Sequence, residues 1–171
     1  MSPTKTIIVS VTAAIIFVLV QGQGPIEPNC LGCICEASTQ CNVSVGCHTP
    51  YAGAYFCGPF LISWAYWADA GKPVIQNDDP NRQGAFENCV NDLYCAAETV
   101  RQYMAKFASN GDCNEDGTVD CADFAQMHRL GGYGCRDASL RTSDYYKKFE
   151  TCWKVVQAAM DHSLTNNNNQ S

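Results

Sequence analysis

Apolar positions recur along much of this chain with the three- and four-residue spacing of an amphipathic helix. The clearest run covers residues 86–108 and predicts the longest helix. Its repeating positions are Val90, Leu93, Tyr94, Ala97, Val100, Met104 and Phe107. A final helix is predicted over 143–160, because Ser143 and Asp144 offer an N-cap before another periodic stretch. The polar residues 166–171 follow and are expected to form a disordered tail.

Shorter elements are predicted in the rest of the chain. Residues 33–41 can form one or two helical turns, and the aromatic run 60–67 predicts a short buried helix after Pro59. A short helix over 124–130 is expected to stop at the glycines that follow it. Residues 48–58 combine Gly, Pro and aromatic side chains without a helical period, so a small hairpin or loop is expected. The pattern therefore predicts a helix-rich α+β chain.

The N-terminal stretch predicts a secretory signal peptide over residues 1–22. Lys5 supplies its positive end, residues 7–20 are apolar, and small residues follow at the cleavage position. A membrane anchor is the alternative, but the apolar run is shorter than the ~20 residues that a spanning helix needs. The mature chain is therefore expected to be secreted and extracellular, with no membrane span. Residues 23–155 would form its domain and residues 156–171 a polar C-terminal tail.

Composition narrows the class of protein. The chain has 171 residues, of which 46% are hydrophobic, and this suits one domain with a real core. The formal net charge is -6, which argues against a nucleic-acid partner because phosphates need a basic surface. A monomer is expected.

The cysteines all follow the predicted signal peptide. An even number of cysteines in a secreted chain predicts a fully oxidised disulfide framework, whose connectivity the spacing leaves open. A zinc site at Cys30 and Cys33 is the alternative, but no second cysteine pair or paired histidine motif matches it. Secretion would also allow N-glycosylation of Asn42, which begins an Asn-Val-Ser sequon. The cysteines are Cys30, Cys33, Cys35, Cys41, Cys47, Cys57, Cys89, Cys95, Cys113, Cys121, Cys135 and Cys152.

An acidic segment over residues 112–123 matches the spacing of a calcium-binding loop. Oxygen-bearing side chains fall at positions 1, 3, 5, 9 and 12, with glycine at position 6 and an available backbone carbonyl at position 7. The candidate ligands are Asp112, Asn114, Asp116, Thr118, Asp120 and Asp123. A bound calcium would be structural, because it would hold the following helix, and no cofactor is expected for catalysis. The alternative is a solvated acidic turn that caps the helix near Asp123.

Several cysteines have fixed neighbours that form motifs. The motifs are Cys30-Leu-x-Cys-Ile-Cys35, Gly46-Cys47, Cys57-Gly-x-Phe60-x-Ile62, Tyr66-Trp-x-Asp69-x-Gly71-x-Pro73, Asn91-Asp-Leu-x-Cys95-Ala, and His128 with Gly134-Cys135. Over about residues 29–153 the chain resembles the invertebrate-type lysozymes, the family that includes the destabilases. The resemblance implies a helix-dominated, lysozyme-like α+β domain with a small β-hairpin. Ala70 and Thr99 stand where the family often has cysteine, which fits the loss of one whole disulfide and leaves about six.

The resemblance also implies cleavage of the β-1,4 glycosidic bond of peptidoglycan, which needs two carboxyl groups beside that bond. The family position of the general acid falls on Ser38, and that of the second carboxylate falls on Pro50. A serine hydroxyl is too weak an acid to replace a carboxyl group. Glu36 is the nearest carboxyl, but a helix turns by about 200° between positions 36 and 38 and points it away.

Destabilases are also linked to isopeptidase activity, which implies a serine nucleophile and a histidine base. His128 matches the histidine, whereas Ala54 and Phe56 occupy the serine positions. The resemblance therefore implies that residues needed for both family activities are missing.

Aromatic faces and carboxylates suit sugar rings, so Tyr66, Trp67, Asp69 and His128 are candidate substrate-binding residues. The alternative is that the aromatic run belongs to the core and that His128 packs on its own helix. The sequence leaves two hypotheses for the function. One is a secreted, antibacterial or digestive protein directed at peptidoglycan or a related glycan, with lost or much reduced muramidase activity. The other is an active lysozyme that uses non-standard carboxylates.

Overall fold

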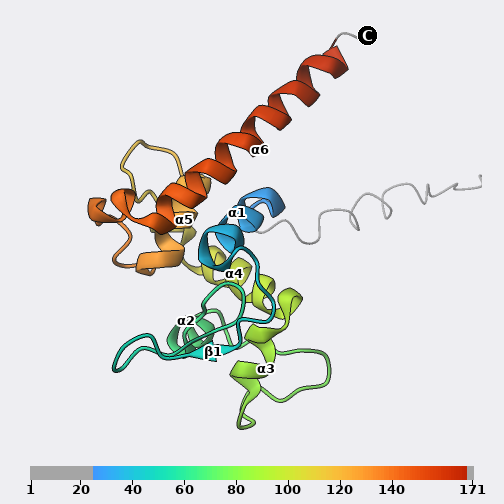
Figure 1. The fold of residues 1–171 in the computed structure, drawn as a ribbon, viewed down its shortest axis with the longest axis vertical. Helices are drawn as coiled ribbons and strands as arrows, with labels where there is room; N and C mark the ends of the chain where they lie inside the picture. The colour runs from blue at the N-terminus through green and yellow to red at the C-terminus, as the bar shows by residue number, and fades with distance from the viewer. Residues whose placement is uncertain (1–24, 169–171) are drawn as a thin grey trace, which may run out of the picture.

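The computed structural model describes residues 25–168, so the predicted signal peptide and the last three residues of the chain lie outside it. This part of the chain forms α-helices, two short 3-10 helices and one small sheet (Figure 1). The expected helix-dominated α+β fold is confirmed. The elements are α1 (Pro28–Thr39), β1 (Cys47–His48), β2 (Phe56–Cys57), α2 (Trp64–Asp69), α3 (Ala85–Asn91), α4 (Leu93–Phe107), η3 (Ala108–Asn110), α5 (Cys121–Leu130), η4 (Ala138–Thr142) and α6 (Asp144–Asn168).

Strands β1 and β2 form the small hairpin that the sequence predicts. They pair antiparallel with Cys47 opposite Cys57, and a disulfide joins these two residues. Gly58 follows with φ at +74°, and a Cβ there would lie 1.6 Å from the carbonyl oxygen of Val90. Only glycine fits this position, because it combines a left-handed backbone with close contact to α3. The hairpin is thereby held against the helical part of the domain.

Helix α1 is the centre of the core. Pro28 lies in its first turn, where a missing N–H is tolerated, and Leu31 and Ile34 are buried along it. Helix α6 packs along α1, and α5 also contacts it (Figure 1). Two disulfides reach from α1 to these helices and so tie three distant segments together. The six disulfides are Cys30–Cys121, Cys33–Cys152, Cys35–Cys41, Cys47–Cys57, Cys89–Cys95 and Cys113–Cys135.

The long helix predicted over 86–108 is two helices. Asp92 interrupts it with an extended backbone, at φ -83° and ψ 127°, and separates α3 from α4. Its side chain accepts the backbone N–H of Cys95 at 2.9 Å and thereby caps α4. Val90 and Val100 of the predicted apolar period are fully buried, whereas Leu93 and Tyr94 directly after the break are 37% and 84% exposed, so the buried face of α4 starts only at Cys95.

The other helices also differ from their predicted bounds. Helix α1 starts at Pro28 and not at residue 33, and α5 starts at Cys121 and not at residue 124. The aromatic run forms α2 only from Trp64, because Ser63 accepts the N–H of Tyr66 at 3.2 Å and acts as the N-cap. The final helix continues beyond Met160 to Asn168, so residues 166–168 of the predicted disordered tail are helical, while residues 169–171 lie outside the described part of the chain. No helix within residues 25–168 is both long and apolar enough to cross a membrane.

Candidate functional site

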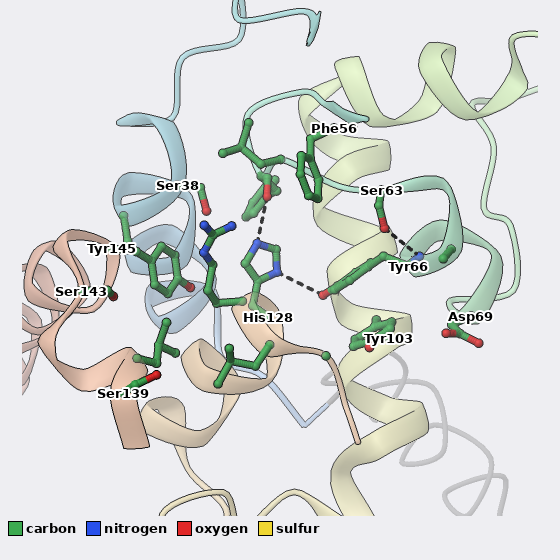
Figure 2. Close-up of a pocket in the computed structure, with 18 of the residues that line it drawn as sticks. Ser38, Phe56, Ser63, Tyr66, Asp69, Tyr103, His128, Ser139, Ser143 and Tyr145 are labelled. Atoms are coloured by element: carbon green, nitrogen blue, oxygen red, sulfur yellow. Dashed lines mark hydrogen bonds between the residues drawn. The ribbon is translucent and has the colours of Figure 1, made fainter. Parts of the chain in front are cut away.

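A cavity of about 680 Å³ opens between α1, the hairpin, α2, α5 and the start of α6. Figure 2 shows the side chains that line it. Aromatic rings, serine hydroxyls and a few charged groups make up most of the lining. The aromatic residues are Tyr51, Phe56, Phe60, Tyr66, Tyr103 and Tyr145, and the serines are Ser38, Ser63, Ser139 and Ser143. This mixture of flat apolar faces and hydroxyl groups matches the surface of a sugar ring.

His128 is fixed at the centre of the cavity by two hydrogen bonds (Figure 2). Its Nε2–H donates to the carbonyl oxygen of Phe60 at 2.9 Å, since a carbonyl can only accept. Its Nδ1 therefore accepts the hydroxyl proton of Tyr66, at 3.2 Å. Tyr66 in turn stacks on Tyr103, with ring centroids 3.6 Å apart. Both ring nitrogens are occupied, so no serine hydroxyl of the described chain is hydrogen-bonded to His128 as a nucleophile would be.

The imidazole of His128 is held in its neutral form. Burial lowers its pKa to about 4, the hydrogen bond to Phe60 opposes this shift, and the nearby charge of Arg129 adds to it. Burial also raises the pKa of Tyr66 well above its ordinary value, so the hydroxyl keeps the proton that it shares with His128. The pair is therefore a fixed, uncharged wall of the cavity at neutral pH.

Protonation of His128 is expected to destabilise the fold. The folded pKa of about 4 lies below the unfolded value of 6.5, so the unfolded state takes up the proton first as pH falls. The contribution of neutral His128 to the free energy of unfolding is fully present above pH ~6.5. About 2–3 kcal/mol of it is lost as the pH falls toward ~4. Urea unfolding near pH 7 and near pH 4.5 measures this loss.

Two variants show whether His128 causes the pH dependence of stability in that experiment. His128→Gln should flatten the pH dependence, whereas the exposed His162→Gln should leave it unchanged. A steep wild-type profile that persists in His128→Gln would assign the effect to other groups.

Position 38 carries no acid. The Ser38 hydroxyl lines the cavity but donates to the carbonyl oxygen of Ile34 within α1, at 2.8 Å. Glu36 is exposed and is not part of the lining, as the helical rotation predicts. Pro50 is exposed and does not line the cavity, whereas its neighbour Tyr51 does.

Three of the four predicted substrate-binding residues line the cavity. Tyr66, Asp69 and His128 do so, whereas Trp67 is only 2% exposed and belongs to the core. The indole N–H of Trp67 donates to the carbonyl oxygen of Pro73 at 2.7 Å, which satisfies it inside the protein. Trp67 lies about 100° around α2 from Tyr66, so it faces the core while Tyr66 and Asp69 line the cavity.

The acidic segment forms a tight turn that is held by its own side chains. Asp112 accepts the N–H groups of Asp116 and Gly117, at 3.2 and 3.0 Å. Asp123 is fully buried, and its two carboxylate oxygens accept three N–H groups, from Cys113 at 2.8 Å, Asn114 at 3.1 Å and Asp120 at 2.9 Å.

These bonds do not fit the predicted ligand role of Asp123. Its Oδ1 accepts two protons and its Oδ2 one, so it lacks the free lone pairs that bidentate coordination of calcium requires. Within residues 25–168, no group of three or more His, Cys, Asp or Glu side chains is arranged to hold a metal ion. Calcium binding by this loop stays a prediction from the sequence, as does glycosylation of the exposed Asn42.

Comparison with known proteins decides the family. The sequence profile of the Destabilase family matches residues 27–152. The chain belongs to the destabilase family. This destabilase-family chain is 34% identical to a lysozyme of Magallana gigas over 126 residues, which are 74% of the chain and 80% of that protein. It is 32% identical to Lysozyme 1 of Crassostrea virginica over 135 residues, which are 79% of the chain but only 60% of that longer protein.

A solved structure confirms the lysozyme-like fold. The destabilase-family chain superposes on an inhibitor-bound lysozyme from Meretrix lusoria with a TM-score of 0.60 and 30% identity. The alignment covers 75% of this chain and 92% of the other. The prediction of an invertebrate-type lysozyme fold from the cysteine motifs is therefore correct.

Some residues of the site had no signal in the sequence. Tyr145 and Ser143 lie at the start of α6, far along the chain from the family motifs at α1 and α2. They reach the cavity because the Cys33–Cys152 disulfide holds α6 against α1. Arg129 follows His128 directly and also lines the cavity. The sequence does not predict this, because adjacent residues of a helix do not share a face.

Proposed function

We propose that this protein is secreted and binds peptidoglycan or a related glycan in the cavity, with lost or much reduced muramidase activity. The observation that carries the proposal is the set of charged groups at the site. Asp69 is the only carboxylate among the described residues that line the cavity. Lysozyme chemistry needs one protonated and one ionised carboxyl group beside the bond.

Asp69 does not replace the missing general acid. Its Oδ1 accepts a hydrogen bond from the Lys106 ammonium at 2.8 Å, and this pairing raises the pKa of Lys106. The ion pair uses the ionised carboxylate, whereas a general acid must carry a proton. The alternative, an active lysozyme with non-standard carboxylates, would need a second acid that the described lining lacks.

The rest of the cavity supports glycan binding. Its volume of about 680 Å³ and its aromatic and hydroxyl lining suit an oligosaccharide segment. The relatives that share its family are named lysozymes, which supports peptidoglycan as the glycan. Six disulfides support secretion, because such bonds persist in oxidising compartments.

Purified oxidised protein is expected to leave a suspension of lysozyme-sensitive cells turbid. The clearing rate should be at least about a hundredfold below that of an active invertebrate-type lysozyme, because the general acid is absent. Ser38→Glu restores one carboxyl group and should gain slow lysis at most, since Pro50 still replaces the second. Rapid lysis by the wild type that disappears in Asp69→Asn would establish the alternative function.

The same protein should sediment with insoluble peptidoglycan. Tyr51→Ala is expected to weaken this binding several-fold, because Tyr51 lines the cavity and is 67% exposed. The matched control is Tyr94→Ala, which removes an 84% exposed tyrosine on α4 outside the lining. Absence of binding by the wild type, or equal loss in both variants, would contradict the proposed function.

A further inference from the structure

Arg129 gives the cavity a positive charge that has no partner in the described chain. It is the only lysine or arginine among the described lining residues, and its side chain is exposed. No carboxylate within residues 25–168 lies within ion-pair distance of it. Its charge nevertheless acts on the site, since it contributes to the lowered pKa of His128 and opposes the rise that burial causes in the pKa of Tyr145.

The one negative charge of the lining does not balance Arg129. Asp69 is already paired with Lys106, and His128 is neutral at physiological pH. Figure 2 shows Asp69 on one side of His128 in that view, and Ser38, Ser143 and Tyr145 on the other. The unbalanced charge of the lining is therefore positive, although the whole chain has a formal net charge of -6.

We propose that the cavity selects saccharides that bear a carboxylate, and that the guanidinium of Arg129 binds this group. The inference rests on the proposed function, because it names the class of glycan that the same cavity takes. A guanidinium can donate two parallel hydrogen bonds to one carboxylate, which sets the position of the sugar as well as its affinity. The aromatic ring of Tyr145 and the hydroxyls of Ser38 and Ser139 belong to the same lining and can contact the ring and hydroxyl groups of that sugar.

An acidic protein gains specificity from this arrangement. Its formal net charge of -6 opposes a general attraction of anionic polymers, so such an attraction does not account for binding of an acidic sugar. The unpaired guanidinium of Arg129 is instead a local positive charge at the cavity. The group could be the lactyl carboxylate of an N-acetylmuramic acid that carries no stem peptide, or the ring carboxylate of a uronic acid, and these share the chemistry that Arg129 recognises.

Calorimetric titration with matched disaccharides tests the inference. The ligands are N-acetylglucosaminyl-N-acetylmuramic acid, its carboxyl-reduced neutral form, and a glucuronate–N-acetylglucosamine disaccharide. The wild type is expected to bind the muramic acid ligand roughly tenfold more tightly than the neutral form, with a preference that shrinks in high salt. Equal affinity for the glucuronate ligand would show that any carboxylate suffices, and weaker affinity would assign the site to the lactyl group.

Variants of two exposed arginines complete the test. Arg129→Gln should abolish the preference for the acidic ligand over the neutral form, while Arg129→Lys should keep part of it. Arg141→Gln is the control, because Arg141 lies on η4 near the cavity but outside the lining. Equal wild-type affinity for acidic and neutral forms, or a preference that survives Arg129→Gln, would overturn the inference and leave glycan binding intact. Failure of the wild type to bind any of the saccharides would instead remove the proposed function.

Discussion

Replacing Cys33 and Cys152 together by alanine is expected to lower the free energy of unfolding by about 5 kcal/mol. The bond spans 119 positions of sequence, so it restricts the unfolded chain over most of the domain. Chain-entropy arguments give the largest stabilisation to the disulfides that close the longest loops. Guanidinium unfolding of the oxidised wild type and the double variant measures the difference.

The matched control is the double alanine variant of Cys35 and Cys41. That bond also starts on α1 but spans only 6 positions, so its removal should cost about 2 kcal/mol. Equal losses in the two double variants would show that native packing, and not the restricted unfolded chain, decides the contribution of these bonds.

The Cys33–Cys152 bond also links the fold to the cavity. It holds α6 against α1, and the first turn of α6 supplies Tyr145 to the lining. The hydroxyl of Tyr145 donates to the carbonyl oxygen of Ala125 at 3.1 Å, which joins α6 to α5 as well. The double variant should therefore weaken saccharide binding even at temperatures where most of the protein is folded.

The cysteine motifs predict much of this protein because they combine chemistry with fixed spacing. They correctly predict the lysozyme-like fold and its small hairpin, in which Cys47 pairs with Cys57. The sequence does not predict the break at Asp92, because the apolar period continues after it with Leu93 and Tyr94. Asp92 itself could have indicated the break, because aspartate is a preferred N-cap and a new helix can start directly after it.

Site residues that depend on distant packing could not be predicted. The candidate Trp67 belongs to the core because it lies about 100° around α2 from Tyr66, and the face of α2 that meets the core is set by packing against distant segments. The role inferred for Arg129 depends on the absence of a nearby carboxylate in space, which no local pattern encodes. The pairing of Asp69 with Lys106 likewise joins α2 to α4 across the fold.

The acidic loop shows how one pattern can serve two physical roles. Asp120 and Asp123 form a capping box at the start of α5, and Asp123 additionally receives the N–H groups of Cys113 and Asn114. Burial raises the pKa of Asp123, and the backbone hydrogen bonds oppose this rise. The carboxylate of Asp123 thereby joins the start of the loop to the start of α5 through backbone hydrogen bonds.

Asp123→Ala is therefore expected to lower the free energy of unfolding by about 3 kcal/mol, because three backbone N–H groups lose their acceptor. Asp123→Asn should lose roughly half as much, since its amide oxygen can still accept from Cys113 and Asn114 while its NH₂ group faces the N–H of Asp120. Asp116→Ala is the control, because Asp116 is exposed, and it should cost less than about 1 kcal/mol.

Urea unfolding of these variants, in chelator and in calcium, separates the two roles of Asp123. If the carboxylate organises the loop directly, the loss in Asp123→Ala is the same in both solutions. If it binds calcium, the ion stabilises the wild type, the Asp123→Ala loss grows with added calcium, and Asp116→Ala shows the same dependence because Asp116 is a candidate ligand of the same ion. A calcium-dependent loss in both variants would contradict the hydrogen-bonding role, whereas equal losses in both solutions would exclude an ion from the stability of this loop.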